Sequence, residues 1–146
     1  MPADKKRKKA AKRRSQCPLN IALELIGDSW SLLIMRDMIF KSFSTFKEFR
    51  TSNEGVATNI LADRLKKMTA EGFITSVRST DDRRVMIYKP TQKGIDLRPV
   101  IVSMMLWTDK YESHSVPPQK IAKQRDWLVH TIGLSLIHIS EPTRPY

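Results

Sequence analysis

A short helix, a turn, a second helix and a β-hairpin follow one another within residues 45–89, and this order constrains the fold more than any other feature. Thr45 and Glu48 have the spacing of a capping box, which predicts the first helix. Residues 51–55 are rich in Ser, Asn and Gly and predict the turn. The second helix is predicted from about residue 58, because its apolar side chains recur at helical spacing. These side chains, which we expect to face the core, are Leu61, Leu65 and Met68.

Two β-branched and aromatic runs, residues 73–78 and 85–89, predict the hairpin. The linking sequence STDDRR gives it a charged tip, and Pro90 ends the second strand. Two short helices followed directly by such a hairpin are typical of a winged helix-turn-helix, in which the second helix enters the major groove of DNA. The predicted fold class is therefore mainly α with a small β-hairpin.

Further helices are predicted on both sides of this unit. Cys17-Pro18 opens one helix that Gly27 ends, and Asp28 is expected to be the N-cap of the next. After Thr91, which is a suitable cap, a single last helix is predicted to run through Trp107. This last helix is more apolar than one packing face needs.

Charge points to a polyanionic partner. The 146-residue chain has a formal net charge of +11, and residues 1–16 alone carry eight basic side chains against one acidic. Nucleic acid is the leading partner and a membrane surface the next, because clustered Lys and Arg displace counterions from phosphates. We expect residues 1–16 to be a disordered basic tail that tethers the protein to DNA.

Several function classes lose support from the sequence. No apolar run approaches the length of a membrane span, so we expect no membrane partner and a cytoplasmic protein, associated with the nucleoid when bound to DNA. The three His residues lie far apart, and no phosphate-binding loop or catalytic signature is present. We therefore expect no enzymatic activity, no metal and no cofactor.

The residues themselves resemble the HxlR-type family of winged-helix regulators, from Cys17 to about Tyr111. The resemblance rests on Cys17-Pro18, on IGDSW running into LLIMRD, on GVATNILADRL in the second helix, on EGFI before the hairpin, and on KPTQKGIDLRPV. It implies a homodimer, joined through the N-terminal and last long helices, that presents two recognition helices to an inverted repeat of double-stranded DNA. The residues expected at this interface are Ile21, Leu25, Val100, Met104 and Trp107.

Polar and basic side chains supply the predicted DNA contacts. Those on the recognition helix are Thr58, Asn59, Ala62, Asp63, Lys66 and Lys67, and those on the wing are Arg78, Arg83 and Arg84. Asn can pair with adenine, while Lys and Arg reach guanine or backbone oxygens. The alternatives are a solvated helix face and a hairpin turn in which Asp81 and Asp82 pair with the arginines.

Cys17 is the only thiol, and in some members of the resembled family a cysteine near this position senses oxidants or electrophiles. The alternative is a small buried apolar residue near the dimer seam. A small-molecule effector bound between the helices is a further possible partner, although no residues single out its site. An RNA-binding or protein-interaction module that uses the same basic surface is the alternative function.

The expected organisation has four segments. Residues 1–16 form the tail and residues 17–112 the winged helix-turn-helix domain. Residues 113–133 are expected to be a linker with a short helix. Residues 134–146 resemble translated vector sequence and are set aside from the fold.

Overall fold

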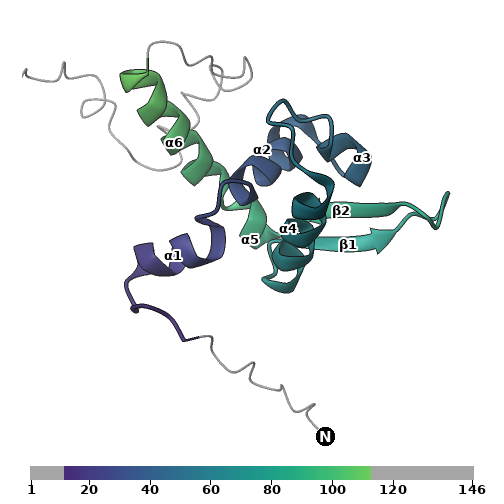
Figure 1. Cartoon of the computed structure of the whole chain (residues 1–146), viewed down its shortest axis with the longest axis horizontal. Coiled ribbons are helices and arrows are strands. Elements are labelled where there is room, and N and C mark those ends of the chain that lie inside the picture. Colours follow the sequence, from purple (N-terminus) through teal and green to yellow (C-terminus); the bar gives the residue numbers. More distant parts are fainter. Residues whose placement is uncertain (1–11, 113–146) are drawn as a thin grey trace, which may run out of the picture.

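A computed structural model describes residues 12–112 of the chain. The expected segments 113–133 and 134–146, and most of the expected basic tail, lie outside the described residues. The helices and strands, in chain order, are α1 (Pro18–Ile26), α2 (Ser31–Lys41), α3 (Phe46–Phe49), α4 (Thr58–Ala70), β1 (Ile74–Arg78), β2 (Met86–Pro90), α5 (Gln92–Ile95) and α6 (Arg98–Tyr111). Figure 1 shows the hairpin of β1 and β2 projecting from the helices, so the predicted winged helix-turn-helix is confirmed.

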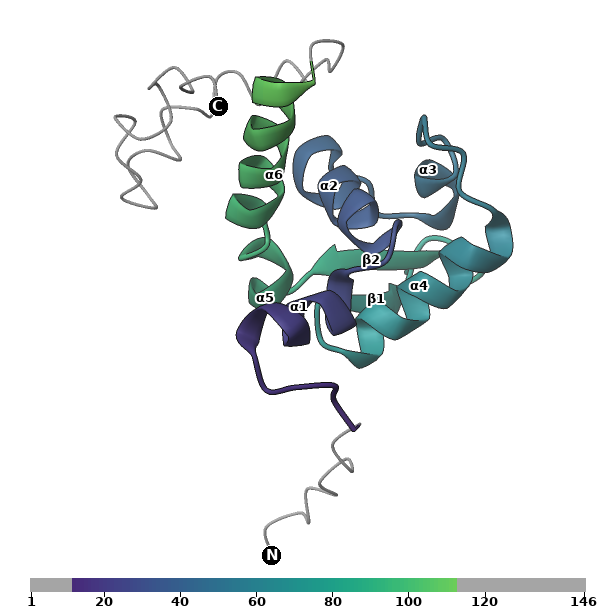
Figure 2. The same cartoon turned by 60° about the vertical axis from the view of Figure 1, so that its left-hand side comes forward.

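The core forms where α2, α4, the start of β1 and the start of α6 meet (Figure 2). Met35 on α2, Leu61 on α4 and Val102 on α6 have no exposed surface. Leu65 and Met68 are also buried, which confirms the core face predicted for α4. Burial of this face fixes which side of α4 is left for solvent or a ligand.

The wing is an antiparallel pair in which Ile74 lies opposite Pro90 and Arg78 lies opposite Met86. The backbone N–H of Tyr88 donates to the carbonyl of Ser44 at 2.7 Å, which ties β2 to the segment before α3. The ring of Tyr88 also meets Phe49 edge-on at 6.3 Å between centroids. The wing and the first helix of the helix-turn-helix are therefore held together at the middle of β2.

The capping box predicted for α3 is confirmed. The backbone N–H of Glu48 donates to Thr45 Oγ1 at 3.2 Å, and the N–H of Thr45 donates to Glu48 Oε1 at 3.1 Å. By contrast, α4 follows Ala57, which offers no side-chain cap. The start of α4 is therefore oriented by packing and by the loop before it.

The single helix predicted after Thr91 is wrong, because the structure has two helices there. Thr91 Oγ1 accepts the N–H of Gly94 and caps only the short α5, and α6 begins at Arg98. Pro99 lies in the first turn of α6, where a missing N–H costs nothing. In a continuous helix its ring would clash with the carbonyl of Ile95, so the helix divides there.

The N-cap predicted at Asp28 is also wrong in position. The N-cap of α2 is Trp30, since residues 28–30 form a turn and the helix begins at Ser31. The carboxylate of Asp28 nevertheless accepts the N–H groups of Trp30 and Ser31, each at 3.0 Å. It supplies the capping acceptor from before the turn.

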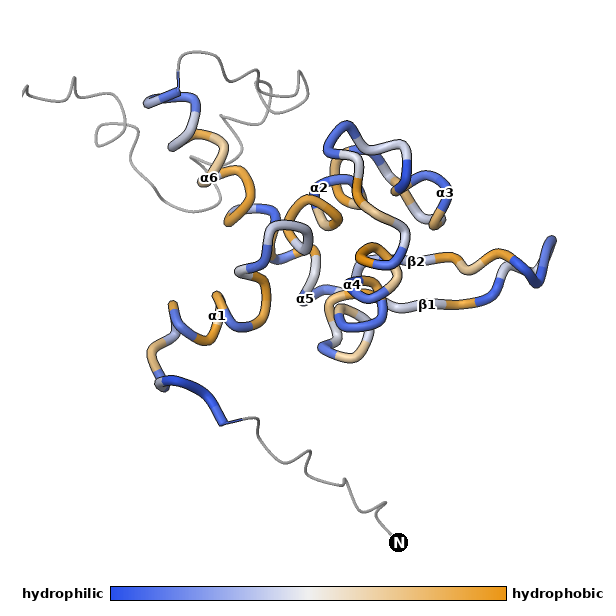
Figure 3. Tube along the Cα trace, in the orientation of Figure 1, coloured by the Kyte–Doolittle hydropathy of each residue, from blue (hydrophilic) through white to orange (hydrophobic). Residues whose placement is uncertain are grey.

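Helices α1 and α6 extend away from this core (Figures 1 and 2), and apolar stretches appear on both in Figure 3. Only Ile26 of α1, and Ile101 and Val102 of α6, are buried. Among residues 12–112, no helix is both long and apolar enough to cross a membrane.

Candidate nucleic-acid interface

The exposed side of α4 brings together the residues predicted for the recognition helix. Thr58, Asn59, Ala62, Asp63 and Lys66 are exposed, and Lys67 is half-buried at the edge of this face. The opposite side holds the buried Leu61 and Leu65. We call the exposed set, with Lys67, the α4 polar face.

The charge on the α4 polar face is shaped by Arg64, which the sequence reasoning did not select. Arg64 Nη1 donates to Asp63 Oδ2 at 2.6 Å, and Arg64 Nε donates to Asp28 Oδ2 at 2.8 Å. Asp63 and Asp28 thus share the positive charge of Arg64, which offsets part of the negative charge of Asp63, and Lys66 and Lys67 add two positive charges to this face.

The three predicted wing arginines are all exposed but have different partners. Arg84 pairs with Asp82 at 3.1 Å, and this contact lowers the pKa of the Asp82 carboxyl. Arg78 Nη1 donates to the carbonyl of Arg83 at 2.9 Å. The alternative of a turn in which the aspartates pair with the arginines therefore applies to Arg84. Within residues 12–112 the guanidinium of Arg83 makes no ion pair, which leaves it available for a phosphate.

Helix α3 adds two exposed cations, Lys47 and Arg50, that the sequence reasoning missed. The first helix of a helix-turn-helix crosses the DNA backbone, which is where phosphate contacts are made. The sequence could have indicated Lys47 and Arg50 as phosphate contacts, because they lie in and directly after the first of the two predicted helices.

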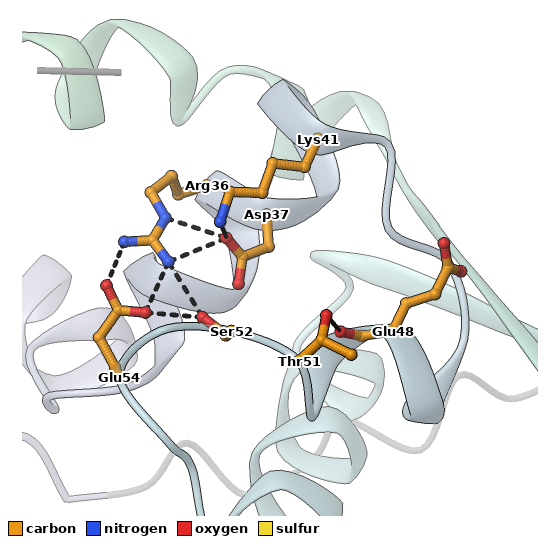
Figure 4. A network of polar contacts seen from close by, with 7 residues as sticks. All are labelled: Arg36, Asp37, Lys41, Glu48, Thr51, Ser52 and Glu54. Carbon is orange, nitrogen blue, oxygen red and sulfur yellow. Dashed lines mark hydrogen bonds and ion pairs between the residues drawn. The ribbon is translucent and has the colours of Figure 1, made fainter.

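A partly buried polar network supports the loop between α3 and α4 (Figure 4). Arg36 donates two hydrogen bonds to Glu54, from Nη1 at 2.6 Å and from Nη2 at 2.8 Å. Arg36 also contacts Asp37 Oδ1 at 2.9 Å, and Ser52 Oγ donates to Glu54 at 2.6 Å. The hydrogen bonds from Arg36 outweigh partial burial and lower the pKa of Glu54 to about 2. The loop that leads into α4 is thereby fastened to α2.

The residues predicted for the dimer interface divide into two groups. Val100, Met104 and Trp107 are exposed on α6, with 65% of Trp107 accessible, and they lie at the helical spacing of a single stripe. Ile21 and Leu25 on α1 are half-buried, and Leu25 packs on the core of its own chain. The exposed apolar residues that the prediction missed are Leu19 and Leu23 on α1 and Tyr111 on α6.

Cys17 is exposed directly before α1. Its side chain makes no capping hydrogen bond, but the backbone N–H groups of Asn20 and Leu19 lower the pKa of the thiol. This favours the thiolate, which is the reactive form. Within residues 12–112 no three His, Cys, Asp or Glu side chains are grouped to hold a metal ion.

The helix-turn-helix and the hairpin that follows it define a winged helix-turn-helix protein. The chain belongs to the HxlR-like helix-turn-helix family, whose model matches residues 25–116. The family predicted from the sequence is thus confirmed.

Named relatives are transcriptional regulators. The HTH-type transcriptional regulator Rv3095 of Mycobacterium tuberculosis is 34% identical over 90 residues, which are 62% of this chain and 56% of that protein. This chain therefore matches little more than half the length of its mycobacterial relatives. The HTH-type transcriptional regulator YodB of Bacillus subtilis is 26% identical over 98 residues, 66% of this chain and 87% of YodB.

Solved structures agree with the fold. The crystal structure of the transcription factor PA1607 superposes with a TM-score of 0.62 at 35% identity, over 73% of this chain and 70% of that one. The reduced form of YodB superposes with a TM-score of 0.55 at 26% identity, over 70% of this chain and 100% of YodB. YodB has also been solved bound to quinone, with a TM-score of 0.52 at 26% identity over 64% of this chain and 97% of YodB.

Proposed function

We propose that this chain is a sequence-specific regulator of transcription that binds an inverted repeat in double-stranded DNA as a homodimer. The α4 polar face carries the proposal. It is a helix surface of Thr, Asn, Lys, Ala and Asp side chains, free of large apolar groups, on the second helix of a helix-turn-helix. Such a surface matches the major groove, where side chains meet base edges.

The proposed contacts divide by chemistry. Asn59 can donate to and accept from adenine, while Lys66 and Lys67 reach guanine or phosphate oxygens. Arg83 at the wing tip suits phosphates or a narrow minor groove. Asp63 is paired with Arg64, so its carboxylate repels the backbone less than its charge alone suggests.

The proposed homodimer rests on the apolar stripe of α6. Val100, Met104 and Trp107 expose a continuous apolar ridge, and Leu19 and Leu23 expose a second one on α1. Single exposed apolar residues are ordinary, but aromatic and Met side chains in a row are typical of the core of a protein interface. A two-fold pairing of these ridges would present two copies of α4 to symmetric half-sites.

The test is the salt dependence of binding to promoter DNA in excess competitor. The double variant Lys66→Ala, Lys67→Ala should weaken binding and make the slope of log K against log salt shallower by about 1 to 2 units, since each lost phosphate contact removes about 0.9. The matched variant Lys66→Arg, Lys67→Arg keeps both charges and should keep the slope. A version lacking residues 1–16 separates tail from domain. Binding that disappears with the tail would refute this function and favour an RNA or protein partner.

A second proposal concerns the thiol. Cys17 is exposed with a lowered pKa, and YodB, a relative, has been solved in reduced, quinone-bound and diamide-treated forms. We propose that Cys17 modulates DNA binding, either as an electrophile adduct or as a disulfide with its dimer mate. In the disulfide case diamide takes up the two electrons and two protons that the thiols release. Treatment should change DNA binding of the wild type and leave Cys17→Ser unaffected; an equal response of both proteins would remove Cys17 from the mechanism.

A further inference from the structure

Arg64 joins the recognition helix to a distant part of the chain. Its side chain lies between the buried and exposed sides of α4, with 27% of its surface accessible. Nε donates to Asp28 Oδ2 at 2.8 Å across 36 residues of sequence. This ion pair connects α4 with the corner at which α1 ends and α2 begins.

Asp28 is a firmly placed partner. The same carboxylate accepts the backbone N–H groups of Trp30 and Ser31 and the hydroxyl of Ser31. Partial burial raises the pKa of Asp28, but these hydrogen bonds and the one from Arg64 outweigh it and lower the pKa to about 2. The carboxylate is therefore fully charged at neutral pH, and its hydrogen bonds to the start of α2 hold it in place beside Arg64.

The corner itself has little freedom. Gly27 ends α1, and a Cβ at this position would overlap the carbonyl oxygen of Leu23. The turn is thus closed tightly enough that only glycine fits. Because the corner is rigid, the ion pair of Arg64 with Asp28 also fixes α4 relative to the direction of α1.

Another polar contact orients α4 at its C-terminal end, where Lys93 Nζ donates to the carbonyl of Glu71 at 2.7 Å, but its N-terminal end has no side-chain cap. Its N-cap, Ala57, gives no side-chain hydrogen bond, and α4 packs chiefly on β1 of the wing. The helix has 13 residues and is therefore about 20 Å long. A tilt of about 10° would move one end by about 3 Å, close to the 3.4 Å rise of one base pair.

We infer that Arg64 is a positioning residue whose ion pair with Asp28 holds α4 at a set angle to the α1–α2 corner, and that this angle determines which half-site spacing the dimer accepts. The inference rests on the proposed function, in which α1 lies at the dimer seam. The covalent path from α1 to α4 runs through α2 and α3, so the Arg64–Asp28 ion pair is the short link from the seam to each recognition helix. Without the ion pair, the distance between the two copies of α4 in the dimer varies more widely, while the residues that contact the bases stay the same.

The experiment uses the full chain and a pool of duplexes whose two half-sites are separated by spacers of every length over one helical turn. Wild type should enrich one spacing about tenfold over its neighbours one base pair away, the size of a typical single-site penalty. Arg64→Met keeps the length of the side chain without its charge, and Asp28→Asn keeps a capping acceptor for α2. Both variants should enrich neighbouring spacings to within about threefold of the best one.

The matched control is Lys66→Met, which removes a cation from the α4 polar face without touching Asp28. It should weaken binding at every spacing and keep the tenfold preference, as expected for a lost phosphate contact. Thermal unfolding identifies any variant that is not folded, and Asp28→Asn tests the inference if Arg64→Met fails to fold. A preference unchanged in folded Asp28→Asn and Arg64→Met would overturn the role of Arg64. A wild type that enriches no inverted repeat would instead overturn the proposed function, and the inference with it.

Discussion

Replacing Arg36 with Met should reduce the free energy of unfolding by about 3 kcal/mol, because it strands a buried carboxylate. The side chain of Asp37 is 3% accessible, and Arg36 reaches it with both Nε and Nη2. Removing one member of a buried ion pair costs about 3–5 kcal/mol. We take the lower end, since Lys41 Nζ remains 3.3 Å from Asp37.

Glu54→Gln is the matched control within the same network (Figure 4). A glutamine keeps one carbonyl acceptor for Arg36, and the Glu54 side chain is a third accessible to solvent. Losing its negative charge should therefore reduce the free energy of unfolding by no more than about 1 kcal/mol. The assay is urea unfolding at pH 7 and one fixed protein concentration, because subunit association would change apparent stability. The reasoning fails if Arg36→Met lies within about 1 kcal/mol of wild type, or if the control is equally costly.

Three other changes test separate parts of the molecule. Thr45→Ala removes the capping box of α3 and should cost about 1 kcal/mol in the same urea assay; an unchanged midpoint would contradict a stabilising cap. Lowering the pH should destabilise the protein below about pH 5, because the pKa values of Asp28 and Glu54, each lowered to about 2, lie below those of the unfolded chain. Circular dichroism against pH measures this, and full stability retained at pH 2 would exclude it. Trp107→Lys places a charge in the α6 stripe and should yield monomers in sedimentation, whereas a dimer that persists would move the seam elsewhere.

Local features were predictable because their physics acts over a few residues. The capping box at Thr45 and the buried face through Leu61 depend on spacings of three and four, which the sequence displays directly. The same holds for the hairpin, whose β-branched runs flank a polar turn. Pro99 marks the division between α5 and α6, but the apolar spacing continues across it, so the two signals predict different helix boundaries.

Long-range polar pairs were not predictable from one sequence. Arg36 and Glu54 are 18 residues apart, and Asp28 and Arg64 are 36 apart. Each is an ordinary charged residue at its own position, and only the packing of α2 and α4 brings the partners together. For the same reason the sequence could not tell that Leu25 packs on its own core while Leu23 is exposed.

The placement of exposed apolar groups bears on which surface meets which partner. Among residues 12–112, the large apolar side chains that remain exposed lie on α1, β1, α5 and α6, and none lies on α3 or α4. A protein-interaction module would need an apolar patch where its partner binds, and the helix-turn-helix has none. Apart from Ala62 and the Asp63 carboxylate, which pairs with Arg64, its exposed groups are mainly amides, hydroxyls and cations, and the cations gain by displacing counterions from phosphates. The two chemistries are thus separated on the molecule, so the proposed binding of DNA by α4 would not compete with the proposed pairing of subunits through α6.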